Sequence, residues 1–320
     1  MTALHKLPVV VLLGPTAAGK TAVAMALQDL LGKSRTQLIS VDSAMVYRGM
    51  DIGSAKPTAA ELADYPHALI DIRDPAEPYN AADFVTDADR AIQAALAAER
   101  VPVLVGGTML YARCFLEGIA ALPDANQATR EQLERDLQEH GDVALHAELA
   151  AVDSQAAAGI DPRNHQRLLR ALEVVRLTGQ PISELWESHK GTAARARLGV
   201  KTEVFAVTPV PRHELHARIH TRFQQMLTLG FLDEVARLKQ REDLHIDLPA
   251  MRAVGYRQAW LHLQGSLDYA QFVADAQTAT RRLAKRQLTW LRRWPDLQAL
   301  TVEDAQAQAQ QLATEVGLLP

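Results

Sequence analysis

The chain has 320 residues, of which 48% are hydrophobic and 22% charged, so it can bury a full core and is neither disordered nor fibrous. No window approaches the roughly 18 uninterrupted apolar residues of a membrane span, and no signal-peptide pattern begins the chain, so we expect a cytoplasmic protein. A formal net charge of −4 excludes a chain that is basic throughout, and the single cysteine, Cys114, excludes an internal disulfide and a cysteine-based zinc site.

The first predicted strand, residues 8–13, leads into a glycine-rich turn and then into a helix-forming segment. The turn reads Gly14-Pro15-Thr16-Ala17-Ala18-Gly19-Lys20-Thr21. A strand, such a turn and a helix in this order form a phosphate cradle, in which backbone N–H groups point inward, Lys20 adds charge and Thr21 offers a hydroxyl to Mg²⁺. The motif indicates a polyphosphate, and on these residues alone ATP, GTP and an isoprenoid pyrophosphate fit equally.

Two further strands are predicted at 37–41 and 101–105, and each ends in polar residues. An alanine-rich helix over 81–100, capped by Asn80, connects them, and this alternation predicts a doubly wound parallel sheet. Asp42 follows the second strand at the edge where ligands bind in such sheets. It could hold Mg²⁺ through water, act as a base on a nucleophile beside the phosphates, or only cap the turn at Ser43.

From residue 123 to residue 199 the strand signal is replaced by helical periodicity, with helices expected over 129–140 and 164–178. We therefore predict an α/β fold of P-loop type, with a core of residues 1–122 and 200–320, an all-helical insertion over 123–199 and a helical C-terminal region. A strand over 203–208 resumes the core, Pro211 begins a helix that contains Arg218 and Arg222, and a further helix covers 269–293. The alanine- and glutamine-rich tail after residue 304 is expected to be a frayed helix.

The charge is unevenly distributed along the chain. Between Met251 and Trp294, eight lysines and arginines are opposed by only two aspartates. A locally basic surface on an acidic protein suits a polyanion that binds one face. We expect Trp290 and Trp294 to pack in the core, whereas Tyr256 could stack on a base.

Six ordered sequence blocks together resemble the bacterial tRNA dimethylallyltransferases, also called tRNA isopentenyltransferases. The first three are the glycine-rich turn, the run from Asp42 to Pro57, and Gly-Gly-Thr-Met-Leu-Tyr at 106–111. The others cover 166–173, 252–258 and 285–292, so the resemblance spans nearly the whole chain. Ala18 and Met45 depart from residues common in that family, and Met45 bears on how the acceptor base packs.

The resemblance implies transfer of the dimethylallyl group from dimethylallyl diphosphate to N6 of the adenosine 3′ to the anticodon (tRNA position 37), giving N6-isopentenyladenosine and pyrophosphate. It implies that Asp42 acts as the base, that residues 14–21 bind the diphosphate with Mg²⁺ on Thr21, and that Arg218 lies near the pyrophosphate. The catalytic set is then Asp42, Thr16, Lys20 and Arg218. We expect a monomer.

The same resemblance, with the basic stretch, predicts residues that contact the tRNA, with the insertion on the anticodon stem-loop. These are Asp42, Ser43, Ala44, Met45, Thr108, Arg130, Gln166, Arg167, Leu168, Leu169, Arg170, Arg252, Ala253, Val254, Gly255, Tyr256, Arg257, Lys285, Arg286, Gln287 and Arg292. Two rival functions are a P-loop kinase of small molecules and an RNA-binding module with a vestigial nucleotide site. Transfer of label from dimethylallyl diphosphate to tRNA separates them.

Overall fold

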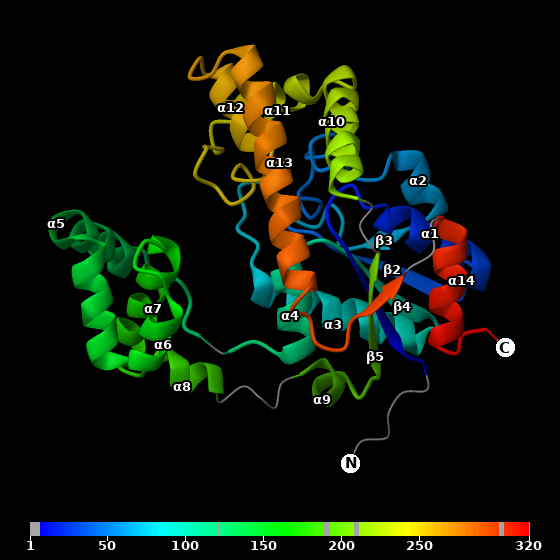
Figure 1. Ribbon diagram of the computed structural model, residues 1–320, viewed down its shortest axis with the longest axis horizontal. Helices are drawn as coiled ribbons and strands as arrows, with labels where there is room; N and C mark the ends of the chain where they lie inside the picture. The colour runs from blue at the N-terminus through cyan, green and yellow to red at the C-terminus, as the bar shows by residue number, and fades with distance from the viewer. Residues whose placement is uncertain (1–6, 121, 188–192, 208–210, 301–303, 320) are drawn as a thin grey trace. The chain divides into compact units, whose positions relative to one another are not determined.

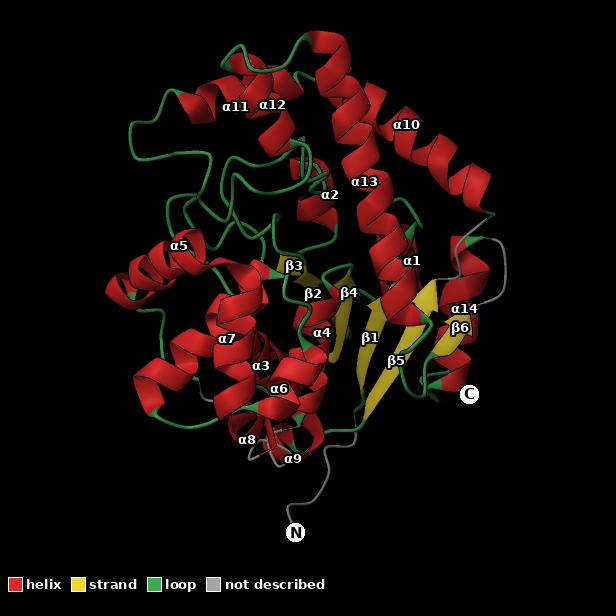
Figure 2. Ribbon diagram, turned by 60° about the vertical axis from the view of Figure 1, so that its left-hand side comes forward, coloured by secondary structure: helices red, strands yellow, loops and turns green. Residues whose placement is uncertain are grey.

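The computed structural model describes residues 7–120, 122–187, 193–207, 211–300 and 304–319. The chain divides into two compact units, one formed by Met1–Leu116 with Arg197–Pro320 and the other by Glu117–Ala196. The insertion predicted from the sequence, residues 123–199, begins and ends a few residues later than this second unit. Figures 1 and 2 show both units.

The first unit contains a parallel six-stranded sheet in the order β3-β2-β4-β1-β5-β6, which confirms the predicted α/β class. Its strands are β1 (Val9–Leu13), β2 (Thr36–Val41), β3 (His67–Ala68), β4 (Val101–Gly106), β5 (Thr202–Val207) and β6 (Gln298–Leu300). The four longer strands are those that the apolar runs predict, although residue 208 lies outside the described residues. The edge strands β3 and β6 are too short to leave a periodic signal in the sequence.

Helices cover both faces of this sheet (Figure 2). Helices α1 (Lys20–Leu31) and α14 (Ala305–Glu315) pack against the face that carries Val10 and Leu12. Helix α3 (Ala81–Ala97) contacts β2 and β4, and Asn80 caps it as predicted, with Asp83 completing a capping box. The strands are buried on both faces, and for this reason they read as continuous apolar runs.

The last helix of the chain differs from the expectation of a frayed tail. Asp304 caps α14 by accepting a hydrogen bond from Ala307 N, and the helix lies along α1. Ala309, Leu312 and Ala313 are buried in the same core cluster as the strands of the sheet. Alanine and glutamine therefore serve close packing here, and the prediction of a frayed end is wrong.

We expect Leu312→Ala to lower the free energy of unfolding by about 2–5 kcal/mol, because it removes a fully buried side chain and leaves a cavity between α14 and α1. Urea denaturation of the two proteins measures the difference. Gln310→Ala is the matched control, since Gln310 is exposed on the same helix and its loss should change stability by less than about 0.5 kcal/mol. Equal stability of Leu312→Ala and the parent chain would contradict the packing.

The remaining helices of the first unit follow β2, β4 and β5 in the chain. They are α2 (Ala59–Asp64), α4 (Met109–Glu117), α10 (Arg212–Thr228), α11 (Phe231–Lys239), α12 (Tyr256–Leu263) and α13 (Tyr269–Leu291), while α9 (Ala194–Leu198) lies at the boundary between the units. Helices α10 to α13 pack on one another (Figure 1). The sequence correctly places the beginnings of α10 and α13.

The second unit is entirely helical among its described residues, as predicted. It contains α5 (Gln127–Val152), α6 (Ser154–Gly159), α7 (His165–Thr178) and α8 (Ile182–Glu187). Gly141, with φ of 80°, breaks α5 into two helices, which explains why the periodic segment ends at 140. Asn164 caps α7, and Gly179 ends it in the left-handed conformation.

Candidate functional site

The carboxyl ends of β1, β2 and β4 meet at one edge of the sheet. Leu13 and Val41 both pair in register with Gly106, so Gly14, Asp42 and Gly107 follow at the same level. In an open parallel sheet this edge is where ligands bind. The register therefore brings the glycine-rich turn, the candidate base and the Gly106–Thr108 turn together.

The glycine-rich turn has the backbone conformation that a cradle for anions requires. Ala17 and Gly19 have φ values of 63° and 95°, and Gly19 precedes the first residue of α1, so free N–H groups face outward at the start of that helix. Lys20 Nζ donates a hydrogen bond to the carbonyl of Pro15 at 2.7 Å. The turn thus presents N–H groups and one ammonium to the same side.

Burial lowers the pKa of Lys20 to about 8, because its ammonium is withdrawn from water. The carboxylate of Asp42 opposes this shift, and the nearby guanidinium of Arg222 adds to it. Burial also lowers the pKa of Arg222, and Asp42 again opposes the change. Two cations and one carboxylate are therefore close enough to influence one another, and an anionic ligand beside them would favour both charged forms.

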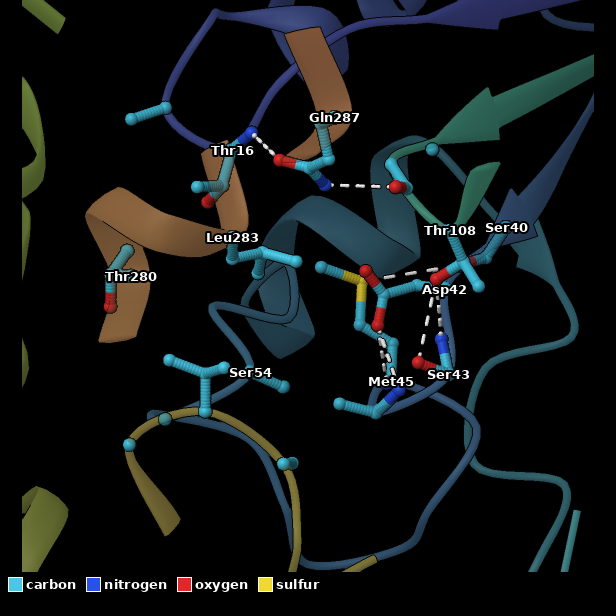
Figure 3. Close-up of a pocket in the computed structure, with 18 of the residues that line it drawn as sticks. Thr16, Ser40, Asp42, Ser43, Met45, Ser54, Thr108, Thr280, Leu283 and Gln287 are labelled. Atoms are coloured by element: carbon cyan, nitrogen blue, oxygen red, sulfur yellow. Dashed lines mark hydrogen bonds between the residues drawn. The ribbon is translucent and has the colours of Figure 1, made fainter. Parts of the chain in front are cut away.

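Gln287 of α13 joins two loops of the site. Its Oε1 accepts a hydrogen bond from Thr16 N at 2.8 Å, and its Nε2 donates to the carbonyl of Gly107 at 2.8 Å (Figure 3). A Cβ on Gly107 would lie 2.5 Å from Nε2, so any larger residue there would displace the Gln287 amide. The sequence predicts a tRNA contact for Gln287, whereas the structure uses its amide within the protein.

Asp42 uses its two carboxylate oxygens differently. Oδ1 accepts hydrogen bonds from Ala44 N at 2.8 Å and Met45 N at 3.1 Å, so it caps the turn. No described residue donates a hydrogen bond to Oδ2. The capping role and the chemical role that the sequence leaves as alternatives are therefore compatible, since one oxygen fixes the side chain and the other stays available.

Thr108 links two of the turns that form the site. Its Oγ1 accepts a hydrogen bond from Ser43 N at 3.1 Å and donates to Ser43 Oγ at 3.4 Å. This contact ties the turn after β4 to the turn after β2, in which Ser43 is exposed. Thr108 therefore lies beside Ser43 and Asp42, with which the sequence groups it among the predicted tRNA contacts.

The site opens into a cavity of about 540 Å³. Figure 3 shows Thr16, Asp42 and Gln287 around it, with Thr280 and Leu283 of α13 on a neighbouring wall and Ser54 on another. The predicted residues that line it are Thr16, Ala17, Lys20, Thr21, Asp42, Ser43, Ala44, Met45, Thr108, Arg252, Ala253, Val254, Gly255, Tyr256, Arg286 and Gln287. A large share of the predicted site therefore surrounds one cavity.

Arg222, and not Arg218, is the arginine of α10 that lines the cavity. Arg218 is exposed, and it does not line this cavity or the smaller one beside the glycine-rich turn. The two residues are one helical turn apart, so they share a face of α10, but Arg222 is deeper along it. The structure therefore places Arg222 beside the cavity, while the role near the pyrophosphate that the sequence predicts for Arg218 stays a prediction.

Two residues predicted to contact tRNA are buried. Tyr256 is 0% exposed and donates its hydroxyl to Glu234, so it is not free to stack on a base. Leu168 is 0% exposed in the core of the helical unit. Neither side chain is exposed as a tRNA contact would require, because an apolar position within a sequence block does not reveal which way it faces.

In the helical unit, Arg130 and Arg170 bind a buried carboxylate. Both guanidinium groups contact Glu173, which is 1% exposed and also accepts a hydrogen bond from Asn126 N. These contacts lower the pKa of Glu173 despite its burial. Arg170 is committed to this network, since it also donates to the carbonyl of Pro123 at 2.7 Å.

Other predicted cations do remain at the surface. The exposed residues are Arg167, Arg252, Arg257, Lys285, Arg286, Arg292 and Gln166, while Leu169 is partly buried.

Trp290 is only partly buried and lines the cavity, with the guanidinium of Arg113 5.7 Å from its ring centroid. The expected core packing of Trp290 is therefore wrong, and Trp294 is likewise partly exposed. Cys114, the single cysteine of the chain, is partly buried.

The oxygen donors around the cavity suit Mg²⁺ shared with a phosphate ligand. Thr21 and Asp42 both line the cavity, and hydroxyl and carboxylate oxygens are the hard donors that Mg²⁺ prefers. Within the described part of the chain, no three carboxylate, histidine or cysteine side chains form a cluster that could hold a metal alone. The donor set fits an ion that takes most of its ligands from phosphate oxygens and water.

Residues 45–294 match the family described as IPP transferase. The chain belongs to this family. Two bacterial relatives are similar over nearly their whole length, and both are named tRNA dimethylallyltransferases. The protein of Chromohalobacter salexigens is 52% identical over 301 residues, covering 94% of each chain. The protein of Hahella chejuensis is 49% identical over 308 residues, covering 93% of this chain and 92% of its own.

Solved structures of the family have the same fold. The full-length tRNA isopentenylpyrophosphate transferase of Bacillus halodurans matches with a TM-score of 0.69 and 34% identity, over 98% of both chains. A eukaryotic dimethylallyltransferase shares the fold with a TM-score of 0.72 at 23% identity, over 89% of this chain and 70% of its own. The family resemblance read from the sequence blocks is confirmed. No helix among the described residues has the length and apolar character needed to cross a bilayer.

Proposed function

We propose that this protein transfers the dimethylallyl group from dimethylallyl diphosphate to N6 of the adenosine 3′ to the anticodon, at position 37 of a tRNA, and releases pyrophosphate. The observation that carries the proposal is the shared cavity: an anion cradle and the free oxygen of a fixed carboxylate open into the same space. Relatives named tRNA dimethylallyltransferases support the choice of substrates.

The reaction needs a base because the N6 amine of adenine is a poor nucleophile. Its lone pair is delocalised into the ring, so the C–N bond forms more easily as a proton leaves the nitrogen. Oδ2 of Asp42 accepts this proton while N6 bonds to the allylic carbon, and the bond between that carbon and the diphosphate oxygen breaks. Oδ1 stays bound to Ala44 N and Met45 N, and it thereby holds the carboxylate in place.

Negative charge grows on the departing pyrophosphate, and the cradle is where that charge is met. The N–H groups of Ala17 and of residues 19–21, the ammonium of Lys20 and the guanidinium of Arg222 are the preorganised donors. Mg²⁺, held by the hydroxyl of Thr21 and by phosphate oxygens, would supply further positive charge to the leaving group. The cradle common in phosphoryl transfer here stabilises a leaving group.

The acceptor base must leave the stack of the anticodon loop to reach Asp42. Such extrusion costs a few kcal/mol and is offset by contacts to flanking nucleotides. Exposed Arg252 and Arg286 at the cavity, with Arg257, Lys285 and Arg292, are suited to bind phosphates around it. In the helical unit, exposed Gln166 and Arg167 are the corresponding candidates for the anticodon stem-loop.

The test is to incubate the protein with tRNA, Mg²⁺ and dimethylallyl diphosphate labelled in the alkyl group, with γ-labelled ATP as the parallel donor. Label from the prenyl donor that appears in tRNA, and in N6-isopentenyladenosine after digestion, is the expected result. Phosphate transfer from ATP with no prenyl transfer would instead identify a kinase. Binding of tRNA with no product from either donor would identify an RNA-binding module.

We expect Arg222→Ala to lower kcat/KM for dimethylallyl diphosphate by about 10²–10³, because it removes one preorganised charge from the leaving-group site. Arg218→Ala is the matched control, since it removes the exposed arginine one turn earlier on α10 and should change kcat/KM by less than about threefold. Steady-state kinetics with saturating tRNA measure both. A larger loss in Arg218→Ala than in Arg222→Ala would restore the assignment made from the sequence.

A further inference from the structure

A long irregular segment follows Asp42 and forms part of the cavity wall. Between Asp42 and Pro57 the chain has no helix and no strand beyond a single bridge at Tyr47. Gly53, Ser54 and Pro57 nevertheless line the cavity. Backbone hydrogen bonds tie residues 45–48 to residues 71–73 and close short turns within the segment, but the four N–H groups of residues 51–54 have no backbone acceptor among the described residues. The position of residues 51–54 is therefore fixed by other groups.

Glu234 of α11 provides one of these groups. Its side chain is buried, with the residue 2% exposed, and four donors converge on its carboxylate. Oε2 accepts hydrogen bonds from Asp51 N at 2.9 Å and Ile52 N at 2.7 Å, while Oε1 accepts from Gly53 N at 3.1 Å and from the hydroxyl of Tyr256 at 2.6 Å. Among the described residues, no lysine, arginine or histidine forms an ion pair with it. The carboxylate is therefore matched to backbone N–H groups and one hydroxyl.

Tyr256 extends this contact along the segment. Its hydroxyl also accepts a hydrogen bond from Ser54 N at 3.2 Å, so four consecutive N–H groups, from Asp51 to Ser54, end on the Glu234–Tyr256 pair. Gly53 lies so close to the aromatic rings that an added Cβ would be 2.2 Å from Phe231 and 2.7 Å from Tyr256. The segment is thus held by hydrogen bonds and by tight contact at the same point.

Lys56 fixes the segment at a second point. Its side chain is 3% exposed and donates to the carbonyl of Tyr47 at 2.9 Å and to the carboxylates of Asp51 and Asp71, both at 2.5 Å. These contacts close residues 47–56 into a loop and join it to the segment that follows β3. Lys56 acts within the loop and its neighbour, whereas Glu234 anchors the loop to α11.

We propose that Glu234 is a positioning residue for prenyl transfer: it holds residues 51–54 against the cavity and so keeps the wall that begins at Asp42 in the geometry the reaction needs. The inference rests on the proposed function. Glu234 has no reacting atom within reach and does not line the cavity, whereas Gly53 and Ser54, which it and Tyr256 hold, do line it. Its effect passes through the loop.

The position of a wall matters most once both substrates are bound. Bringing two reactants into alignment accounts for a large part of catalysis, and a displacement of about 1 Å can cost about 10²-fold in rate. The charged groups of the cradle belong to other elements, the turn after β1 and α10. Loss of Glu234 should therefore lower kcat and leave KM for the donor nearly unchanged. A purely structural role would instead lower stability with no change in kcat per folded molecule.

Glu234→Gln is the decisive variant because it preserves the size of the side chain. One carboxylate oxygen becomes an NH₂ group, which cannot accept the N–H groups that converge there, so part of the loop loses its anchor. We expect kcat for prenyl transfer, corrected for the folded fraction, to fall between about tenfold and 10²-fold, with KM for dimethylallyl diphosphate and tRNA within about threefold. Tyr256→Phe leaves the three backbone hydrogen bonds to Glu234 and should lower kcat by a smaller factor.

Val235→Ala is the matched control for stability alone. Val235 is the next residue of α11, is fully buried and does not line the cavity, so its loss should lower Tm and leave kcat unchanged. An unchanged kcat in Glu234→Gln, or a rise in KM alone, would overturn the proposal; if Glu234→Gln does not fold, an unchanged kcat in Tyr256→Phe would overturn it. Wild-type protein that transfers no prenyl group would refute the proposed function instead.

Discussion

We expect Asp42→Asn to lower kcat for prenyl transfer by about 10²–10⁴, the range typical of a lost general base, while tRNA still binds with its original affinity. The reason is that the two carboxylate oxygens have different roles: Oδ1 caps the turn, and Oδ2 is available as the base. Asparagine keeps an oxygen for Ala44 N and Met45 N, so the turn stays in place, but it has no basic group to take the proton from N6. Single-turnover kinetics with bound tRNA measure the chemical step directly.

Comparison with Asp42→Ala separates the base from the cap. Alanine removes both functions, so its Tm should fall by more than that of Asp42→Asn while the loss in kcat is similar. Asp64→Asn, which neutralises an exposed carboxylate on α2, serves as the control for charge alone. Full activity in Asp42→Asn would show that the cap is the only role of this side chain.

The second large effect concerns Lys20. We expect Lys20→Ala to lower kcat/KM for dimethylallyl diphosphate by about 10²–10³ and to change tRNA affinity by less than about threefold, because its ammonium belongs to the cradle proposed to bind the diphosphate. Lys33→Ala removes an exposed lysine from the loop after α1 and is the matched control. Equal losses of donor use and tRNA binding in Lys20→Ala, with folding intact, would contradict this division.

The lowered pKa of Lys20 adds a test by pH. Since the group titrates at about 8 in the folded chain, its ammonium is present below that pH and is lost as the pH rises through it. We expect kcat/KM for the donor to decline above pH about 8, and Lys20→Arg to move this decline to higher pH, since arginine stays protonated. Calorimetry near pH 8.5, in buffers of different ionisation enthalpy, should show proton uptake when the diphosphate binds. A profile that stays flat well above pH 8 would refute the role of this ammonium.

The longer elements of the fold can be predicted because their signals are local. Val9–Leu13 and Val101–Gly106 are buried on both faces and appear as apolar runs, and Asn80 and Gly179 mark helix ends by their own chemistry. The failures occur where stability comes from contacts that are distant in sequence. Helix α14 is polar and alanine-rich, and only its position beside α1 makes it part of the core.

The site shows the same contrast. The cradle and the position of Asp42 can be predicted from local sequence. A glycine-rich turn between a strand and a helix indicates a phosphate cradle, and a carboxylate directly after a strand lies at the edge where ligands bind. The choice between Arg218 and Arg222 depends on how α10 packs, and both fit the sequence equally. Glu234 gives no local signal, since its four donors belong to segments that fold next to it from elsewhere in the chain.

The double use of Gln287 also restricts how α13 can vary in length. An α-helix turns by about 100° per residue, so inserting or deleting one residue between Tyr269 and Gln287 would swing this amide away from both Thr16 and Gly107. Substitutions of the exposed Lys285 and Arg286 do not change the direction in which Gln287 points. Insertions and deletions in this helix should therefore be far more damaging than substitutions of its surface residues.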